Sequence, residues 1–193
     1  MRIILASSSP RRKELMRLIT DNFTVISAAV DEKTPEDIPA EDQPQYLADI
    51  KAEAGAKICP DDVVIGCDTM VIFDGRVLGK PVDMKQCRQY IRMLSGKCHK
   101  VITGCAIKFG SIKRRFSVCT EVYFRELDDN EIEEYISSDE PYDKAGGYGI
   151  QGKGSLLTEK ICGDYFNVVG LPVSKLNIEL RKLLNDINKG DLL

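Results

Sequence analysis

The sequence predicts a single α/β domain built on a mixed sheet rather than a purely parallel one. Short apolar, β-rich runs alternate along the chain with segments whose apolar residues recur at helical spacing, as in α/β proteins. Turn sequences typical of β-hairpins separate several of the expected strands. Hairpins join antiparallel strands, so they do not occur in a purely parallel sheet. With 193 residues, 43% of them hydrophobic and 30% charged, the chain has the composition of an ordinary globular protein. We therefore expect one domain over residues 1–193.

The first half of the chain is expected to form three strands and three helices. Ser9 and Pro10 have the residue types preferred at the N-cap and the first position of a helix. Asp74 and Gly75 signal a hairpin turn after a long apolar strand. The expected strands are Ile3–Ala6, Phe23–Val30 and Val63–Phe73, and the expected helices are Pro10–Ile19, Gln45–Lys57 and Met84–Leu94.

The second half is expected to add two long strands, Val101–Phe109 and Phe116–Phe124, joined by the basic hairpin GSIKRR. Asp128 is a suitable N-cap for a helix over Asp129–Ser137. A glycine-rich loop, EPYDKAGGYGIQGKG, and a strand over Leu156–Ile161 follow. The last helix is amphipathic, with apolar positions at Val173, Leu176, Leu180, Leu183 and Leu184.

Charge and composition exclude several classes of protein. The net charge of −3 argues against a broad basic surface for nucleic acid. The apolar run at the N-terminus is too short for a signal peptide, and none approaches ~18 residues, so we expect a cytoplasmic protein without a membrane partner. The seven cysteines lack a CxxC pair and are expected to be small core residues rather than disulfides or zinc ligands. His99 is the only histidine, so zinc hydrolase and Ser-His-Asp schemes lack their parts.

Three cations stand at the beginning of the first predicted helix, where the helix dipole disfavours them. Arg11, Arg12 and Lys13 directly follow Pro10. Each positive charge at this end costs about 0.3–1 kcal/mol when nothing offsets it. A bound phosphate would offset it, since helix N-termini bind anions. The alternative is a basic turn that is simply solvated.

Asp68 is a carboxylate inside the apolar run VVIGCDTMVIF. Burying an unpaired carboxylate costs several kcal/mol or more, so Asp68 needs a cation, a metal or an opening to a cleft. The structural interpretation is a carboxylate that pairs with an arginine or caps a turn. The functional interpretation is a general base or a metal ligand, followed by the hydroxyl of Thr69.

Other charged residues stand near the expected ends of elements. Lys80, in LGKP, is fixed in direction by the proline that follows it, and Glu32 comes just after the second strand. Lys51 lies near the apolar face of its helix, where a lysine can also extend along the surface to water. Arginines and lysines suit phosphate, and carboxylates suit a hard cation such as Mg²⁺, so the set indicates a phosphate and metal site.

The glycine-rich loop contains a GxGxxG match from Gly147 to Gly152. The match follows EPYDKA and precedes a strand, which is the wrong context for a dinucleotide fingerprint. Lys153 is followed by glycine rather than Ser or Thr, so the loop is not a Walker A loop either. Two interpretations remain: a backbone that a ligand approaches closely, with Gln151 as a hydrogen-bonding group, or a loop that needs positive φ angles.

Together these segments resemble the Maf family of nucleoside triphosphate pyrophosphatases. The matching pieces occur in family order over nearly the whole chain: LASSSPRR, Glu32, Lys51, GCDT, LGKP, LSG, the glycine-rich loop and GDYFNVVGLP. The resemblance implies a twisted central sheet flanked by helices, with a deep cleft, as in inosine triphosphate pyrophosphatases. It also implies hydrolysis of a nucleoside triphosphate to the monophosphate and pyrophosphate with a divalent metal. Mg²⁺ is the expected metal, with Mn²⁺ or Co²⁺ as alternatives.

The resemblance also implies roles for individual residues. Asp68 matches the base that activates water and, with Glu32, the metal-binding position, whereas Ser7, Arg12, Lys51 and Lys80 match positions that hold the triphosphate. Arg11, Thr69 and Gln151 match specificity positions and resemble the branch that acts on dTTP and UTP. The branch for 7-methyl-GTP typically carries tryptophan in place of Arg11. Two departures are Cys67 and Gly147, which stand where alanine is common; Gly147 is expected to loosen its loop.

The expected function is therefore hydrolysis of dTTP and UTP, and of modified pyrimidine nucleotides, in a house-cleaning role. Two alternatives stay open. One is a nucleotide-binding regulator of septum formation with little turnover, and the other is a pyrophosphatase of the 7-methyl-GTP type. The expected partner is the nucleotide substrate, and a homodimer is compatible with the family.

Overall fold

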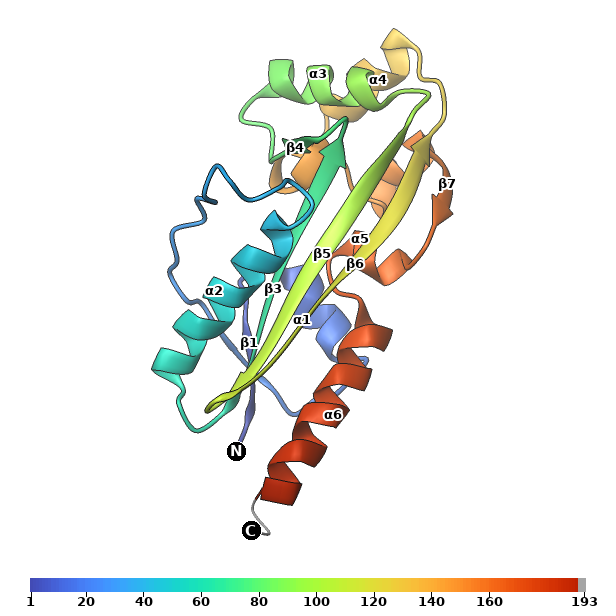
Figure 1. Ribbon diagram of the computed structural model, residues 1–193. Helices are drawn as coiled ribbons and strands as arrows, with labels where there is room; N and C mark the ends of the chain where they lie inside the picture. Colours follow the sequence, from blue (N-terminus) through green and yellow to red (C-terminus); the bar gives the residue numbers. More distant parts are fainter. Residues whose placement is uncertain (191–193) are drawn as a thin grey trace. The chain divides into compact units, whose positions relative to one another are not determined.

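The computed structural model describes residues 1–190 and contains a seven-stranded mixed sheet (Figure 1). The strand order is β2-β1-β3-β5-β6-β7, with β4 paired to β3. β1 runs parallel to β2 and β3, whereas β4 is antiparallel to β3 and β7 to β6, which confirms the predicted mixed sheet. The strands are β1 (Ile3–Ala6), β2 (Thr24–Ile26), β3 (Val63–Phe73), β4 (Arg76–Leu78), β5 (Cys98–Phe109), β6 (Ile112–Phe124) and β7 (Thr158–Cys162).

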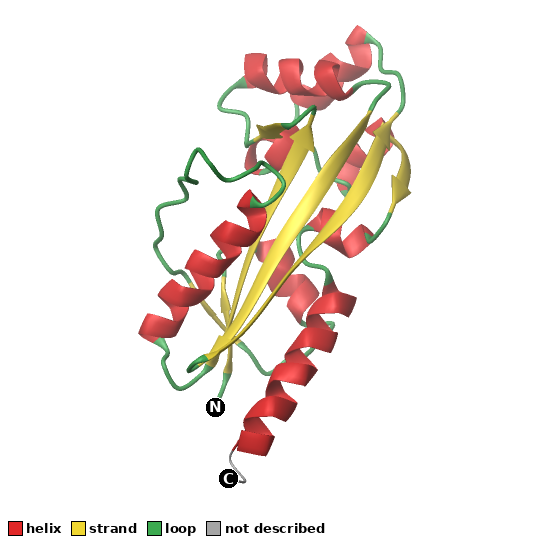
Figure 2. Cartoon of the chain, in the orientation of Figure 1, coloured by secondary structure: helices red, strands yellow, loops and turns green. Residues whose placement is uncertain are grey.

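Helices accompany the sheet, as the fold class requires (Figure 2). Three short 3-10 turns lie within residues 141–157, the region predicted as a glycine-rich loop. The α-helices are α1 (Pro10–Met16), α2 (Gln43–Ile58), α3 (Met84–Leu94), α4 (Asp129–Ile136), α5 (Tyr165–Val169) and α6 (Val173–Gly190).

Strands β1 and β3 and helix α3 have the predicted bounds, and the other elements differ at their ends. β2 is shorter than predicted because β1 ends at Ala6, which pairs with Ile26 and leaves no further strand to pair with. α1 ends at Met16 rather than Ile19, since a tighter turn follows in which Ile19 donates to the carbonyl of Met16. β5 and β6 take in most of the predicted basic hairpin and leave a tight turn at Gly110 and Ser111, whose glycine has φ +53°.

The remaining differences are small, apart from the helix α5 and the three-residue strand β4, for which the sequence offered only the hairpin signal at Asp74 and Gly75. α2 begins at Gln43, two residues before the prediction, and α4 ends at Ile136, one residue before it. The structure places β7 at Thr158–Cys162 rather than 156–161. The five-residue α5 was not predicted, because so short a helix shows too few turns for a periodic pattern.

The chain divides into two compact units. The first unit comprises Met1–Asp68, Thr103–Val118 and the described chain from Gly170; the second comprises Thr69–Ile102 and Cys119–Val169. Strands β3, β5 and β6 each contribute residues to both units. The single domain over residues 1–193 stays a prediction.

In the first unit, α2 lies directly on the strands because glycines leave room for its backbone (Figure 1). A Cβ on Gly66 of β3 would stand 2.3 Å from the carbonyl oxygen of Ala48 and 2.6 Å from the amide nitrogen of Ala52. A Cβ on Gly104 of β5 would stand 2.4 Å from the amide nitrogen of Gln45. No side chain fits at either glycine, so these positions set how closely α2 approaches the sheet.

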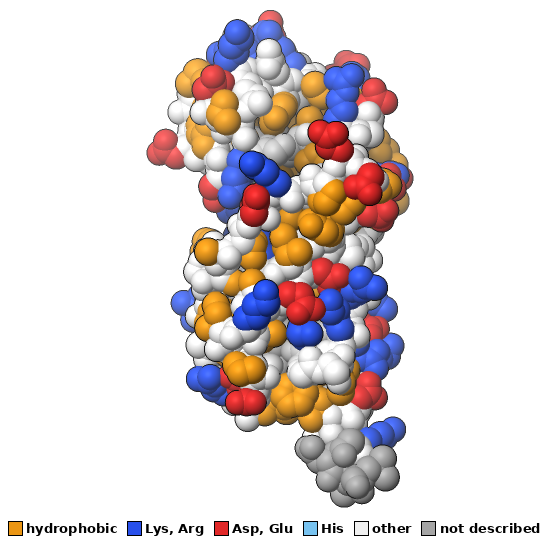
Figure 3. Space-filling model, turned by 60° about the vertical axis from the view of Figure 1, so that its left-hand side comes forward, with side chains coloured by type: hydrophobic (Ala, Val, Ile, Leu, Met, Phe, Trp, Pro, Cys, Tyr) orange, Lys and Arg blue, Asp and Glu red, His pale blue; other side chains and the backbone are white. Residues whose placement is uncertain are grey.

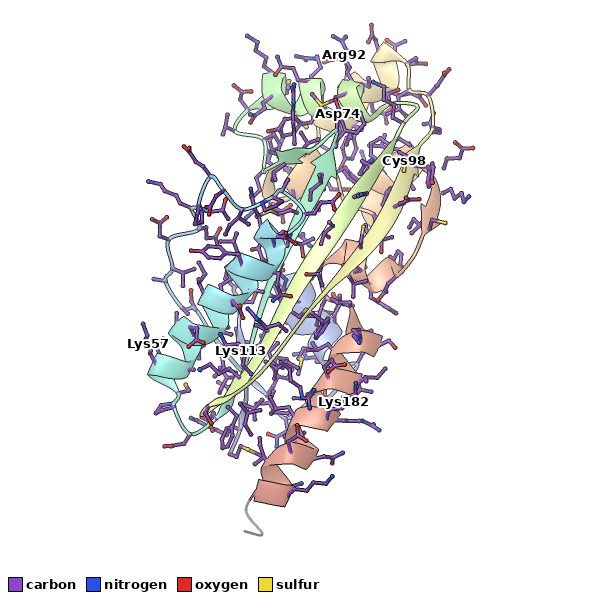
Figure 4. The ribbon with its side chains drawn as sticks, in the orientation of Figure 1. Lys57, Asp74, Arg92, Cys98, Lys113 and Lys182 are labelled. Atoms are coloured by element: carbon purple, nitrogen blue, oxygen red, sulfur yellow. The ribbon has the colours of Figure 1, made fainter. Side chains whose placement is uncertain are left out.

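The predicted inner face of α6 is largely confirmed, since Leu176, Leu180 and Leu183 are buried and Val173 and Leu184 are half-buried. No described helix has the length and apolar character of a transmembrane span. On the face drawn in Figure 3, Lys and Arg side chains are interspersed with Asp and Glu side chains. Lys113, labelled in Figure 4, likewise lies beside an acidic residue, since its Nζ is 2.7 Å from an oxygen of Glu53 on α2.

The cysteines follow the prediction only in part. All seven are free thiols. Cys67, Cys87 and Cys105 are buried as expected, but Cys98, Cys119 and Cys162 are exposed, and Cys59 is intermediate. The core assignment is wrong for the exposed three because a strand's side chains alternate in direction, and Cys119 falls on the outward phase of β6.

The core of the second unit contains a polar pair. α3 and α4 pack together (Figure 1), and the edges of the His99, Phe124 and Tyr148 rings meet beside them. Nε2 of His99 lies 2.6 Å from the hydroxyl of Tyr148, and His99 is only 2% exposed. Burial lowers the pKa of His99 from 6.5 to about 4. The only histidine thus anchors the glycine-rich loop to the sheet rather than serving as a catalytic group.

Stability is expected to fall as the pH drops from 6.5 toward 4, because the unfolded chain then binds a proton that folded His99 does not. The contribution is fully present above pH 6.5 and is lost toward the folded pKa of about 4. The loss is on the order of 3 kcal/mol. Urea unfolding at a series of pH values measures it, with His99→Gln as the control for all other titrating groups. Identical pH dependence in the two proteins would contradict the prediction.

Candidate active site

The start of the chain forms the predicted helix cap, and the side chain of Arg12 bonds to residues on either side of it in the sequence. The Ser9 hydroxyl accepts a hydrogen bond from the Arg12 amide (3.4 Å), and Pro10 is the first helical residue, so the predicted cap is confirmed. The Arg12 guanidinium donates to the hydroxyl of Ser7 (3.3 Å) and to the carbonyl of Gly170 (2.9 Å). Arg12 is therefore fixed in place by two segments of the first unit.

Gly170 makes a contact with a predicted site residue, Arg12, that the sequence did not reveal. It lies in the motif GDYFNVVGLP and has φ +126°, a conformation that favours glycine. Its carbonyl, 158 residues from Arg12 in the chain, accepts from Nε of that arginine. The positive φ directs this carbonyl, so the last motif of the chain orients an arginine of the first motif. The place of Gly170 in its motif was the only signal in the sequence.

Asp68 has its counter-ion, but the partner is a lysine rather than the arginine of the structural interpretation. Nζ of Lys51 lies 2.6 Å from Oδ1 of Asp68 and 2.8 Å from an oxygen of Glu32. The side chains of Lys51 and Asp68 are each 12% exposed, and that of Glu32 is 63% exposed. Lys51 therefore does not extend along the surface to water, as the alternative interpretation had it, but joins two carboxylates.

The close approach of α2 explains why these groups meet. Lys51 directly precedes Ala52, whose amide faces Gly66 of β3, and Asp68 comes two residues later on that strand. With a side chain at Gly66, the helix could not lie this close, and the ammonium group would be moved away from the carboxylate. The glycine of GCDT thus positions the lysine, whereas the sequence presented it only as part of a motif.

A second cation acts on the same part of β3. The Cys67 thiol lies 3.6 Å from that of Cys105, and this hydrogen bond lowers the pKa of Cys67. The positive charges of Arg12 and Lys51 lower it further. The carboxylate of Asp68 acts in the opposite direction, so cations and a carboxylate both lie close enough to influence this segment of β3.

Glu32 and Asp68 fit a magnesium ion that phosphates help to bind. Mg²⁺ is commonly held by one or two carboxylates together with substrate phosphates, rather than by a cage of protein ligands. Two carboxylates converge here on one cation, Lys51. Within residues 1–190, no group of three Asp, Glu, His or Cys side chains could hold a metal ion. Two carboxylates are thus the kind of donor set that a phosphate-completed site uses.

The second unit brings the LGKP segment next to the glycine-rich loop. The amide of Gly146 donates to the carbonyl of Gly79 (3.0 Å), directly before Lys80. Lys80 is exposed after β4, and Gln151 is exposed in the loop. Thr69 follows Asp68 on β3 and is half-buried. Two predicted substrate-binding segments are thus neighbours within this unit.

The glycines of the loop need positive φ angles, as one interpretation of the sequence required. Gly146, Gly147 and Gly152 have φ values of 71°, 72° and 67°. A Cβ on Gly147 would also stand 3.2 Å from the Cys87 sulfur. Glycine at 147, where alanine is common in the family, therefore fits its backbone without strain.

The structure thus assembles the predicted site residues in separate groups. It joins Ser7 to Arg12, and Lys51 to both Glu32 and Asp68, all in the first unit. Arg11 lies on α1 in the same unit, whereas Thr69, Lys80 and Gln151 belong to the second. The deep cleft, and the roles of all these residues, stay predictions.

The chain is similar to known proteins over most of its length. Residues 2–183 match the family described as Maf-like protein. The dTTP/UTP pyrophosphatase of Bacillus velezensis is 49% identical over 174 residues, which cover 90% of this chain and 92% of that protein. The dTTP/UTP pyrophosphatase of Alkaliphilus oremlandii is 48% identical and covers 96% of this chain and 97% of its own. The solved structure of the Staphylococcus aureus Ham1 protein aligns with a TM-score of 0.46 and 16% identity, over 64% of this chain and 72% of that one. Because the family match spans residues 2–183 and the relatives are nearly half identical over nine-tenths of the chain or more, the chain belongs to the Maf family.

Proposed function

We propose that this protein hydrolyses nucleoside triphosphates, dTTP and UTP in particular, to the monophosphate and pyrophosphate. The observation that carries the proposal is the cluster of Glu32, Lys51 and Asp68, in which a nearly buried carboxylate is fixed by a nearly buried ammonium group. Relatives that align over nine-tenths of the chain are named for this reaction. The reaction would take place on the cytoplasmic nucleotide pool.

In the proposed mechanism, Asp68 accepts a proton from the attacking water. The water oxygen forms a bond to the α-phosphorus while the bond from that phosphorus to the pyrophosphate oxygen breaks. Lys51, 2.6 Å from Asp68, orients the carboxylate for this task and places positive charge beside it. Asp68 and Glu32 would hold Mg²⁺, which when bound supplies charge neutralisation for the phosphates and acidifies water.

Phosphate binding is assigned to cations that the chain has already fixed in place. Arg12 is held by Ser7 and Gly170, so little side-chain freedom is lost when a phosphate binds to it. Its planar guanidinium matches two phosphate oxygens at once. Ser7 offers a hydroxyl, and Lys80, exposed directly after β4, is assigned to the leaving pyrophosphate as a point charge. Preorganised positive charge of this kind is the main source of catalysis in phosphoryl transfer.

Base selection is assigned to Arg11, Thr69 and Gln151. Their side chains carry the hydrogen-bond donors and acceptors that the edge of a pyrimidine requires. The arginine after Pro10, where the 7-methyl-GTP branch carries tryptophan, favours dTTP and UTP.

A panel of triphosphates tests the proposal. We expect pyrophosphate release from dTTP and UTP, dependent on Mg²⁺, Mn²⁺ or Co²⁺, with much slower release from purine nucleotides. Preferred cleavage of 7-methyl-GTP would instead place the protein in the other branch. Nucleotide binding without pyrophosphate release from any triphosphate would refute the proposal and favour a regulatory role.

A further inference from the structure

Two residues outside the predicted site form hydrogen bonds to residues 149–154, the part of the glycine-rich loop that carries Gln151. Both belong to the second unit. The hydroxyl of Tyr135 accepts a hydrogen bond from the amide of Gly149 (3.3 Å) and donates one to the carboxylate of Glu140 (3.4 Å). The same carboxylate accepts from the amides of Lys153 (2.8 Å) and Gly154 (2.9 Å). Tyr135 and Glu140, here called the loop brace, therefore hold the backbone on both sides of Gln151.

The packing around the loop brace leaves the loop little room to move. A Cβ on Gly154 would stand 2.1 Å from the carbonyl oxygen of Gly149, so the two ends of the Gln151 segment touch. A Cβ on Gly152, whose φ is +67°, would stand 2.7 Å from a carboxylate oxygen of Glu140. Tyr135 itself is only 4% exposed. Gln151 thus lies in a turn whose two ends, Gly149 and Gly154, touch each other and are hydrogen-bonded to the loop brace.

We propose that Tyr135 and Glu140 are positioning residues that set the selectivity for the pyrimidine base by fixing the backbone at Gln151. This inference rests on the proposed function and deepens it. Thymine and uracil present an N–H between two carbonyls, whereas cytosine presents a bare ring nitrogen beside an amino group. A glutamine amide distinguishes these edges only if its donor and acceptor are held at defined places, because a mobile amide adapts to either. The brace supplies that restriction through main-chain contacts, without touching the substrate.

Glu140→Gln and Tyr135→Phe test this role. Glu140→Gln turns one of the two acceptor oxygens into an N–H donor, and Tyr135→Phe removes only a hydroxyl from a buried ring. For each variant we expect KM for dTTP to rise about tenfold with kcat little changed, and the preference for dTTP over dCTP to shrink by a similar factor. A residue that merely stabilised the fold would lower the melting temperature and the active fraction without changing KM or this preference.

A double-mutant cycle separates positioning from general damage. In a Gln151→Ala background, Glu140→Gln is expected to cause no further rise in KM, because the side chain that it positions is gone. Glu133→Gln is the matched control, since it breaks an ion pair with Arg88 in the same unit and leaves the loop intact. Tyr135→Phe keeps the test decisive if Glu140→Gln fails to fold.

The possible failures can be told apart. If the wild-type protein releases no pyrophosphate from any triphosphate, the proposed function fails and this inference fails with it. If the wild-type protein is active but both variants keep the wild-type KM and base preference, the positioning role alone is overturned. Equal effects of Glu140→Gln with and without Gln151 would overturn it as well.

Discussion

Replacing Asp68 by asparagine is expected to lower the turnover number for pyrophosphate release by about 10³-fold. Asparagine has the same shape, and its carbonyl oxygen can still accept the hydrogen bond from Lys51, so β3 and α2 should keep their contact. The negative charge that accepts a proton from water, and that helps to hold Mg²⁺, is lost. Steady-state pyrophosphate release measures the effect, and circular dichroism checks that the variant is folded.

Asp62→Asn is the matched control for Asp68→Asn. Asp62 is 7% exposed, comparable to the 9% of Asp68, and it lies in the same unit next to β3. Its carboxylate pairs with Arg2 (2.6 Å), an interaction that fastens the N-terminal strand and has no role in the proposed chemistry. We expect Asp62→Asn to lower the melting temperature while turnover per folded molecule stays unchanged. A folded Asp68→Asn variant with turnover within a few-fold of wild type would remove Asp68 from its assigned role.

Replacing Lys51 by methionine is expected to lower kcat/KM by about 10²-fold or more. Methionine has an unbranched apolar side chain of similar length, so we expect the packing around this largely buried position to change little. Without the ammonium group, the carboxylates of Asp68 and Glu32 repel each other and the incoming phosphates. The nearly buried Asp68 is left without its cation, which should also lower the free energy of unfolding by about 3 kcal/mol.

Kinetics and thermal unfolding of Lys51→Met should be compared with those of Lys108→Met. Lys108, on β5, is similarly shielded, with 19% of its side chain exposed. Its Nζ lies 3.3 Å from an oxygen of Glu53 on α2, the helix that carries Lys51. The ion pairs that join Asp68 and Glu32 are made by Lys51, not by Lys108. We expect the control to change stability modestly and kcat/KM hardly at all. Equal losses of activity in both variants would mean that Lys51 acts through the packing of α2 rather than through its charge.

Local features of the fold could be predicted where neighbouring residues decide the structure. Ser9 and Pro10 define the start of α1 by cap chemistry alone, and the bounds of β1, β3 and α3 follow from apolar runs and helical spacing. The errors lie at strand ends and at exposed cysteines. β5 and β6 extend through charged residues because each strand supplies the other with backbone hydrogen-bond partners, which side-chain pattern does not reveal.

For the candidate site too, the residue types could be predicted from the sequence, whereas their contacts could not. The motifs indicated which side chains are chemically suited to phosphate, metal and base, and the resemblance to a family supplied their roles. The pairing of Asp68 with Lys51 rather than with an arginine could not be predicted, since it depends on how closely α2 approaches Gly66. The loop brace could not be predicted either, because Tyr135 lies on α4 and Glu140 at the far end of the same loop, and only the folded chain brings them to the backbone beside Gln151.

By itself, the sequence determined the fold class and the family, and it singled out a set of residues whose chemistry suits a nucleotide. These depend on composition, periodicity and motif order, all of which are properties of the chain read in one dimension. Only the tertiary structure decided the partners: Lys51 with Asp68 across 17 residues, and Arg12 with Gly170 across 158. The physical reason is that such contacts require two segments to approach within hydrogen-bonding distance. That approach is set by Gly66, where no side chain separates α2 from β3, and by the positive φ of Gly170, and neither effect can be seen before distant segments of the chain are packed together.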